Sequence, residues 1–303
     1  GITSYQAMDS CSGTQIAQAL GMRLNYTVDI MGGGSSTEAL IAHAVGLLEG
    51  GYCNRMAIFR SMNGRSGRRM GGQAPGGPMA PMPIAGIGDM GRVWGFTTPA
   101  QMFGISCMRY MRDYNMKSET LGKIAIAHRN NALLNPKSIM RDKGPLTMED
   151  YLSSRWVSKP FHLFDCCLET DVAAAMIICR REEAYDLKQP PVYIMGGTAR
   201  TMADSPVWNY SRDEIHRVGG FYGSQRLFGM SGVHQNDIDL MSSYDAFTFT
   251  ALIQVEAYGF SPRGEAAAYI AEGNLEIDGA RPHNTSGGHL SEGYTHGISM
   301  VIE

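Results

Sequence analysis

The chain has 303 residues, of which 44% are hydrophobic and 18% charged, and its net charge is −3. This balance is typical of a globular protein that buries a sizeable core, and it excludes a largely disordered chain. A net charge this close to zero gives no sign of nucleic acid or an anionic membrane as a partner. The longest purely apolar run, at 172–179, is far shorter than the roughly 20 residues that a membrane-spanning helix needs.

The six cysteines are scattered and form no CxxC pair, so a zinc site built from cysteines is not expected. Such thiols are typical of buried positions in a reducing compartment. Since we find no secretory signal peptide, this predicts a cytoplasmic protein. The chain begins without a Met and ends at Val301-Ile302-Glu303, inside an apolar segment. We therefore expect both termini to be truncated relative to a longer protein.

The first elements indicate an α/β fold. Residues 27–30 are a predicted strand, and the sequence MGGG at 31–34 is a predicted tight turn. Ser35, with an acidic residue three positions later, has the pattern of a capping box, and leucines then recur at helical spacing until two glycines end the helix. Residues 55–60 follow as a predicted buried strand. This order of strand, turn, helix and strand predicts an α/β fold.

A long stretch rich in Gly and Pro, at 64–95, interrupts these elements. A loop of this length is usually functional or an excursion from the core. The last third repeats the early order of elements, which predicts two similar halves with the excursion inside the first. Further helices are predicted at 98–114, 118–134, about 147–155 and 246–258, strands at 191–196 and 239–242, and an apolar core segment at 167–180.

Residues 283–297 (HNTSGGHLSEGYTHG) are the densest cluster of polar and Gly residues near the end of the chain. Gly287 and Gly288 predict a close approach of the backbone to another group, because only Gly adopts such conformations without a Cβ penalty. The three His of this stretch lack the i, i+4 spacing of a helical metal pair, and no matching acidic ligand is obvious. Hydrogen-bonding roles are therefore favoured, with a metal site as the alternative.

Four arginines lie in the stretch RSMNGRSGRR at 60–69. One interpretation is a solvated loop. The other is the capture of a polyanionic ligand, such as the phosphates of coenzyme A, through charge-assisted hydrogen bonds. The GxGxxG match at 86–91 follows four prolines where a dinucleotide site needs a strand, so no such site is expected.

Several stretches resemble the active-site segments of thiolases. Residues 32–50 resemble the nucleophile turn and the buried helix after it, and 242–247 (SSYDAF) resemble the Asn-Glu-Ala-Phe segment. Residues 259–265 and 284–297 resemble the loops that lead to the Gly-His-Pro site. Over almost all its length, the chain is thus similar to the lipid-transfer, sterol-carrier-type branch of the thiolase superfamily.

The resemblance implies an α/β thiolase fold with two similar βαβαβ halves in a layered αβαβα arrangement. The halves would span 1–183, with a loop domain at about 61–165, and 184–303, which would be incomplete. It also implies a homodimer, because thiolase folds pair through their core sheets, and an acyl-CoA substrate.

The departures from the thiolase pattern concern its reactive groups. The resemblance places the nucleophilic Cys at Gly33 or its neighbour, but no Cys occurs between Cys11 and Cys53. Covalent thioester chemistry needs a thiolate or an equivalent nucleophile, so thiolysis is disfavoured. Tyr244 stands where the thiolase Asn would be, and Tyr294 where the thiolase His would be.

A phenol has an ordinary pKa of about 10 and can act as an acid or a base when its neighbours tune it. This pattern resembles the thiolase-like aldolases of bacterial steroid side-chain degradation. The resemblance implies retro-aldol cleavage of a β-hydroxyacyl-CoA into a ketone and a short acyl-CoA, with a steroid side chain as the family's best-known substrate. It also implies a small zinc-ribbon and OB-fold partner protein, and no cofactor beyond the coenzyme A of the substrate.

On this hypothesis the two phenols form a proton-transfer pair, and their hydroxyl groups should meet. Neighbouring His would tune a phenol, main-chain N–H groups would hold the thioester oxygen, and arginines would bind coenzyme A. Two alternatives remain: an acyltransferase that uses Cys107 or Cys166, and a non-catalytic lipid-binding subunit. The candidate catalytic residues are Tyr294, Tyr244 and His296, and the candidate substrate-binding residues are Gly33, Gly34, His283, Gly287, Gly288, Arg65 and Arg68.

Overall fold

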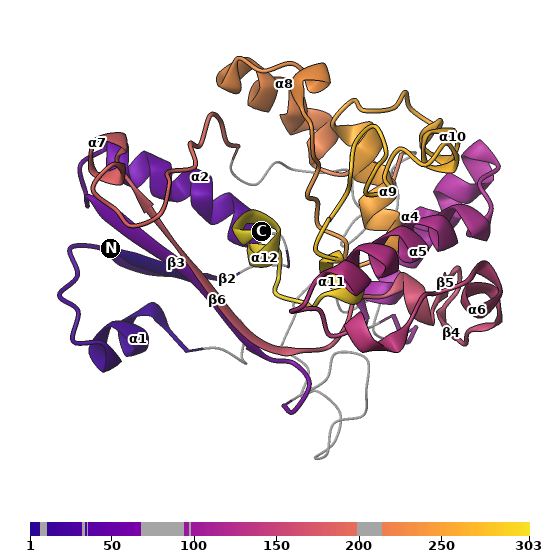
Figure 1. The fold of residues 1–303 in the computed structure, drawn as a ribbon, viewed down its shortest axis with the longest axis horizontal. Helices are drawn as coiled ribbons and strands as arrows, with labels where there is room; N and C mark the ends of the chain where they lie inside the picture. The colour runs from indigo at the N-terminus through magenta and orange to yellow at the C-terminus, as the bar shows by residue number, and fades with distance from the viewer. Residues whose placement is uncertain (7–10, 32–33, 35, 68–93, 97, 199–213) are drawn as a thin grey trace.

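The computed structural model describes residues 1–6, 11–31, 34, 36–67, 94–96, 98–198 and 214–303. Its central feature is a four-stranded sheet in the order β2-β1-β3-β6 (Figure 1). The first strand pairs in parallel with both β2 and β3, and β6 runs antiparallel along the whole of β3. The strands are β1 (Ile2–Gln6), β2 (Thr27–Met31), β3 (Arg55–Asn63) and β6 (Asp171–Cys179).

Helix α2 (Ser36–Glu49) packs on one face of this sheet. Its buried leucines and Ala44, which recur at helical spacing, pack with Met56 and Ile58 of β3 and Ile178 of β6. A second, smaller core lies under helix α1 (Gly13–Ala19), which buries Ala17 against β1 and β3. The predicted strands at 27–30 and 55–60 and the helix between them are therefore confirmed.

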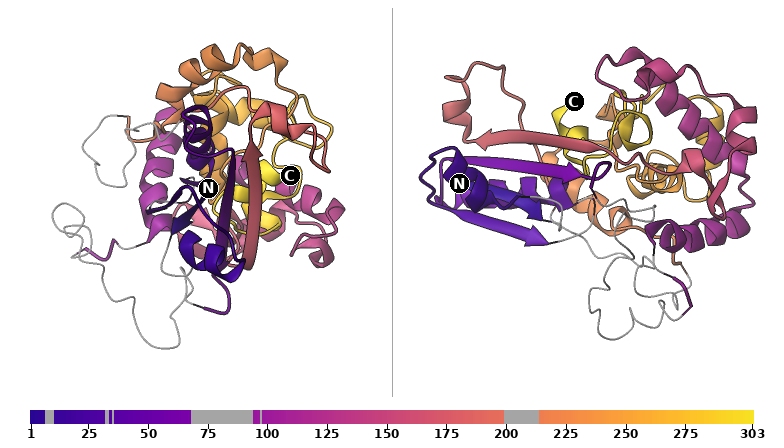
Figure 2. Two further views of the ribbon diagram at one scale, coloured as in Figure 1. Left: turned by 90° about the vertical axis from the view of Figure 1, so that its left-hand side faces the viewer. Right: turned by 90° about the horizontal axis from the view of Figure 1, so that it is seen from below.

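The larger core lies to one side of the sheet, where helices from both halves of the sequence gather (Figure 2). Helix α5 is central and contacts α9 as well as three shorter helices, because apolar side chains cover several of its faces. Helix α4 confirms the helix predicted at 98–114, and it begins with a capping box at Thr98 and a Pro in its first turn. The long helices are α4 (Pro99–Tyr114), α5 (Ser118–Leu134), α8 (Gly220–Ser231) and α9 (Thr248–Ala257).

Shorter elements connect these helices. Strands β4 and β5 form a separate antiparallel pair. No helix in the described ranges is long and apolar enough to cross a membrane. The short elements are α6 (Met148–Ser153), β4 (Trp156–Ser158), β5 (Phe161–His162), α7 (Arg181–Ala184), α10 (Ala266–Ala271), α11 (Gly288–Ser291), α12 (Ile298–Ile302) and the 3₁₀ turns η1 (Arg141–Lys143), η2 (Leu163–Asp165) and η3 (Gln235–Asp237).

Two predicted strands do not form. Residues 191–196 pair with no strand among the described residues, and Val192 is 95% exposed. Residues 239–242 are irregular, with only an isolated bridge between Met241 and His283. Both segments have strand-like composition, but a strand needs a hydrogen-bonding neighbour, which composition does not supply. The second of the two expected halves therefore shows helices but no sheet in the part that the structure describes.

The predicted core segment at 167–180 forms β6, but at the edge of the sheet. Its residues alternate between exposed and more buried positions, and Ile177 is 69% exposed. A strand at a sheet edge has one neighbour and here one covered face, so an unbroken apolar run does not guarantee burial. The predicted capping box at Ser35 and most of the 64–95 loop, with its GxGxxG match, lie outside the described residues.

Candidate active site

The phenol oxygens of Tyr244 and Tyr294 lie 2.6 Å apart, so the predicted meeting of the two hydroxyl groups is confirmed. Tyr244 comes from the loop before α9, and Tyr294 from the loop between α11 and α12. Burial, and after it the neighbouring Tyr294, raises the pKa of Tyr244 well above its usual range. Tyr244 is therefore a neutral phenol at neutral pH, held in a short hydrogen bond with a second phenol.

Gly34 explains how the Tyr244 phenol fits at the start of α2. A Cβ atom at position 34 would overlap the hydroxyl oxygen and ring of Tyr244. The phenol thus fills the space that any larger residue at this position would need. This is the turn where the resemblance places the thiolase nucleophile. The neighbouring candidate, Gly33, lies outside the described residues.

A buried carboxylate, Asp245, follows Tyr244 directly. Its two oxygens lie 2.9 Å from His128 Nδ1 and 3.2 Å from His289 Nδ1, and the His289 main-chain N–H donates to Oδ1 at 2.9 Å. Burial disfavours its charge, but the contacts with His128 and His289 outweigh burial and hold the pKa of Asp245 well below its usual range. The segment that carries Tyr244 is therefore fixed by an ionised side chain inside the core.

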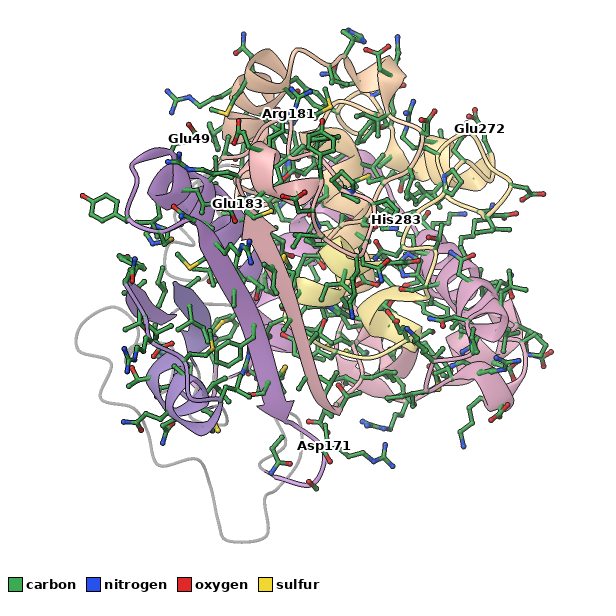
Figure 3. The ribbon with its side chains drawn as sticks, turned by 60° about the vertical axis from the view of Figure 1, so that its left-hand side comes forward. Glu49, Asp171, Arg181, Glu183, Glu272 and His283 are labelled. Carbon is green, nitrogen blue, oxygen red and sulfur yellow. The ribbon has the colours of Figure 1, made fainter. Side chains whose placement is uncertain are left out.

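His283 belongs to the same buried network but touches neither phenol. Its Nδ1 lies 2.8 Å from His128 Nε2, and its Nε2 lies 2.7 Å from Ser243 Oγ. Burial, and then the nearby His128, lowers the pKa of His283 to about 3, so the ring is neutral. Figure 3 shows it among the C-terminal loops, and Asn131 of α5 donates to its main-chain oxygen at 3.0 Å. His283 is therefore linked to Tyr244 through Ser243, the residue before it, and through His128 and Asp245.

His289 packs against both phenol rings. Its ring meets those of Tyr244 and Tyr294 edge-on, at centroid distances of 5.1 and 5.0 Å. The N–H of Gly297 donates to His289 Nε2 at 3.1 Å. Nε2 is therefore an acceptor, which places the ring hydrogen on Nδ1, facing Asp245. The His289 ring is thus held in one orientation, and it packs against both phenol rings.

His296 packs edge-on against Tyr294, at a centroid distance of 4.8 Å. Arg60 Nε donates to its Nδ1 at 2.9 Å, so the other ring nitrogen carries the hydrogen. Burial, and then the Arg60 charge, lowers the pKa of His296 to about 3. Arg60 is only 1% exposed, so its inclusion in a basic surface patch is wrong: its position in β3 directs it into the core.

Gly287 and Gly288 both adopt positive φ, at 107° and 59°, and the predicted close approach is confirmed. The groups that they approach belong to the protein itself. A Cβ atom at Gly287 would crowd Ala132 of α5, and one at Gly288 would overlap the Asp245 carboxylate and Asn284. These glycines therefore let the loop pack on α5 and on the carboxylate behind Tyr244.

Arg65 is exposed in the turn after β3, and its main-chain N–H donates to Asp171 Oδ1 at 2.8 Å. Figure 3 shows Asp171 at the start of β6, beside the end of β3. Arg68 and Arg69 lie outside the described residues.

Three thiols near the core are poorly suited to act as an alternative nucleophile. Burial raises the pKa of Cys107 well above its usual range and that of Cys166 to about 12. Cys167 lies close enough to Tyr244 to influence it, and burial raises its thiol pKa well above the usual range too. Among the described residues, no three His, Cys, Asp or Glu side chains gather as a metal site.

Sequence reasoning missed the residues that support the phenols, namely Asp245, His128 and Arg60. His128 had a detectable signal, since it continues the buried stripe of Leu121, Ile124 and Ala125 on α5. A polar residue on such a stripe needs a buried partner. Nothing in the sequence identifies that partner as Asp245, which is 117 positions away by residue number.

Comparison with known proteins places this geometry in a family. A model described as "Thiolase C-terminal domain-like" matches residues 212–303. A "Steroid side-chain-cleaving aldolase" of Thermomonospora curvata is 35% identical over all of this chain and 78% of its own length. A "17-hydroxy-3-oxo-4-pregnene-20-carboxyl-CoA lyase" of Mycobacterium tuberculosis is 34% identical over all of this chain and 79% of its own length.

Among solved structures, the "Ltp2-ChsH2(DUF35) aldolase" superposes with a TM-score of 0.87 at 34% identity, covering all of this chain and 77% of that one. The similarity spans the sheet, the helical core and the loops that bring the two phenols together. The chain belongs to the thiolase superfamily, in the branch that contains these thiolase-like aldolases.

Proposed function

We propose that this protein is an acyl-CoA retro-aldolase, a lyase that splits a β-hydroxyacyl-CoA into a ketone and a shorter acyl-CoA. The observation that carries the proposal is the 2.6 Å hydrogen bond between Tyr244 and Tyr294, beside a turn where Gly34 leaves room for a phenol. Two relatives at 34–35% identity, matched over the whole chain, are named for aldolase or lyase activity, which supports the proposal.

The reaction needs a proton acceptor and a proton donor in one place. The β-hydroxyl loses its proton, its oxygen forms the ketone, and the Cα–Cβ electron pair moves onto the acyl group as an enolate. The enolate carbon then takes up one proton, so the overall reaction neither consumes nor releases protons. Two hydrogen-bonded phenols can perform both transfers, because a proton that enters at one hydroxyl can leave from the other.

The enolate oxygen requires hydrogen-bond donors that are already oriented. We assign this role to the main-chain N–H groups at the start of α2, near Gly34, where the helix dipole also favours negative charge. Gly288 is less suited than its sequence position indicated, because its N–H points toward Ser286 Oγ at 3.4 Å, inside the protein. His296 and His289 hold the ring of Tyr294 in place, and Asp245 anchors the segment of Tyr244.

The substrate class and the assembly extend this proposal. A steroid side-chain CoA thioester is the substrate that we propose, in line with the names of the two relatives. The solved relative's name gives two components, which supports a partner protein for this chain. We propose that this partner is a small protein with a zinc ribbon and an OB fold. We also propose that the chain forms a homodimer and that Arg65 and Arg68 contact coenzyme A.

The proposal is tested by incubating the protein, together with its partner, with β-hydroxyacyl-CoA substrates and measuring the ketone product. An acyltransferase would instead form an acylated Cys, which mass spectrometry detects. The raised pKa values of Cys107, Cys166 and Cys167 count against that alternative, because a protonated thiol is a poor nucleophile. A non-catalytic subunit would bind the acyl-CoA and leave it intact.

A further inference from the structure

Glu38 lies in the first turn of α2, four positions after Gly34, which is about one turn of helix. Its carboxyl group rests against the main chain of Gly297, where a Cβ atom would overlap it. Gly297 adopts a positive φ of 86° and directly follows His296. Glu38 is thus enclosed between the start of α2 and the loop that carries Tyr294.

The carboxyl group of Glu38 is buried, but not all of its oxygens accept a hydrogen bond. Its Oε2 atom has no hydrogen-bond partner in the described ranges, and neither do the buried hydroxyl groups of Ser36 and Thr37 beside it. Ser36 is 2% exposed and Thr37 is fully buried. An unpaired buried polar atom is costly, and such groups tend to mark catalytic positions.

Glu38 also lies near the phenol pair. Gly34, about one helical turn before it, packs against the Tyr244 hydroxyl, and the Gly297 main chain that it contacts closely follows Tyr294. Burial is the main cause of the raised pKa values of Tyr244 and Tyr258, and the Glu38 carboxylate adds to both. Two further titratable groups lie on the loop side: His296 is neutral, and the positively charged Arg60 guanidinium beyond it donates to that ring. Helix α12 presents Ile298 and Met300, without titratable side chains, from its buried face.

We propose that Glu38 is the proton reservoir of the tyrosine pair, taking up the proton that leaves the substrate hydroxyl and returning it for delivery to the enolate carbon. This inference rests on the proposed retro-aldolase function. Tyr244 is too weak an acid to remain ionised during the reaction, so the phenols can relay a proton but not store it. A carboxylate about one helical turn from Gly34, which the Tyr244 hydroxyl contacts, can store it.

The substrate O–H proton moves to one phenol oxygen, while the proton of the pair passes along the Tyr294–Tyr244 hydrogen bond to the Glu38 carboxylate. The Cα–Cβ bond breaks, the ketone C=O forms, and the enolate holds the electron pair. The relay then reverses: Glu38 gives its proton back, and the phenol protonates the enolate carbon. Glu38 ends as the carboxylate with which it began.

This role predicts a characteristic pH profile. Burial raises the pKa of Glu38 from 4.5 to about 8, although a hydrogen bond to its own backbone opposes the shift. Because the carboxylate is the active form, kcat should increase with pH up to about 8 and then level off. A carboxyl group that only packs against Gly297 would leave kcat without this dependence.

The test compares the full-length protein, with its partner, and the variant Glu38→Gln in ketone release between pH 5.5 and 9.5. We expect Glu38→Gln to lower kcat by about 10²-fold or more, with KM changed little, and to abolish the dependence near pH 8. Glu38→Asp should keep the pH dependence at a lower kcat. Glu49→Gln, at the exposed far end of the same helix (Figure 3), is the matched control and should behave like the wild type.

Equal kcat and an unchanged pH profile in Glu38→Gln would overturn the inference, even though the aldolase function would stand. No ketone from the wild type would instead refute the proposed function. If Glu38→Gln fails to fold by circular dichroism, the comparison of Glu38→Asp with wild type decides. Loss of the pH dependence in that variant, with kcat unchanged, also counts against the reservoir.

Discussion

The phenol oxygen of Tyr244 occupies the position that a Cβ atom of residue 34 would take, and Gly34 is what makes this possible. The resemblance to thiolases indicates that their nucleophilic thiol lies at the corresponding turn. Here the turn leaves room for the Tyr244 phenol, which comes from another loop and which we propose as a proton-transfer group. A change of chemistry from thiolysis to retro-aldol cleavage would thus need two coupled features, a side chain lost from one segment and a phenol gained on another.

Gly34→Ala tests this coupling. The new methyl group would overlap Tyr244, so the phenol must move and its hydrogen bond to Tyr294 should break. We expect kcat for ketone release to decrease by about 10²-fold, comparable to loss of an acid–base group. Gly46→Ala is the control, since a Cβ atom there meets nothing within 4 Å. It should keep full activity and increase the free energy of unfolding by about 0.5–1 kcal/mol.

The two tyrosines should behave as one unit. Tyr244→Phe and Tyr294→Phe each remove one hydroxyl group from the relay, so each should lower kcat by about 10²–10⁴-fold. The kcat of the double variant should be little lower than that of either single variant, because removing one member of a unit already removes the activity of the whole unit. Steady-state kinetics of ketone release measures all three. Tyr52→Phe, at an exposed site, is the control. Additive losses would indicate two independent roles.

Stability should decrease in acid because of the buried His. His283 has a folded pKa of about 3 against an ordinary 6.5, so the unfolded chain binds more protons between these values. Stability is therefore complete above about pH 6.5 and decreases as pH falls toward 3, by up to about 1.4 kcal/mol per pH unit for each proton. His296 contributes in the same window. Asp245, whose pKa is depressed, adds a loss below its ordinary 3.8.

Urea unfolding between pH 4 and 7 measures this acid sensitivity. The variant His283→Gln should be less stable at pH 7, because Ser243 and His128 lose their partner. It should also show a smaller decrease of stability from pH 6.5 to 4. An unchanged slope would mean that His283 is not held neutral in the folded protein.

Glu38 should give the opposite dependence on pH. Its folded pKa of about 8 lies above the ordinary 4.5, so the folded protein binds the extra proton between these values. Its contribution is therefore complete below about pH 4.5 and is lost as pH rises toward 8. The stability of Glu38→Gln relative to wild type should increase across this range. Urea unfolding from pH 5 to 8.5 tests this without any substrate, and a constant difference would contradict it.

Much of the local structure could be predicted from the sequence. The leucines of α2 and the stop at its end define that helix, and Thr98 with Pro99 marks the start of α4, because caps and apolar periodicity act over a few residues. The strand predicted at 191–196 was wrong because its pairing depends on a neighbour elsewhere in the chain. A pattern of apolar residues does not reveal whether that neighbour is present.

The candidate site was predictable only where a known motif marked it. Tyr244 and Tyr294 stood out because they replace residues of thiolase motifs. Arg60 and Glu38 did not, because an Arg in a Gly-rich stretch favours a surface patch and an acid at a helix start favours a cap. Their functions arise from contacts with His296 and Gly297, more than 200 positions away in each case by residue number.

The catalytic role of the phenol pair is tested most directly by measuring ketone formation from β-hydroxyacyl-CoA substrates, a steroid side-chain thioester among them. The wild type and Tyr294→Phe are compared with the partner protein present. We expect stoichiometric ketone and shorter acyl-CoA from the wild type. From the variant we expect at least about a 10²-fold slower release, with the fold intact by circular dichroism. Equal rates from both proteins would contradict the claim that this hydrogen-bonded phenol pair cleaves the carbon–carbon bond.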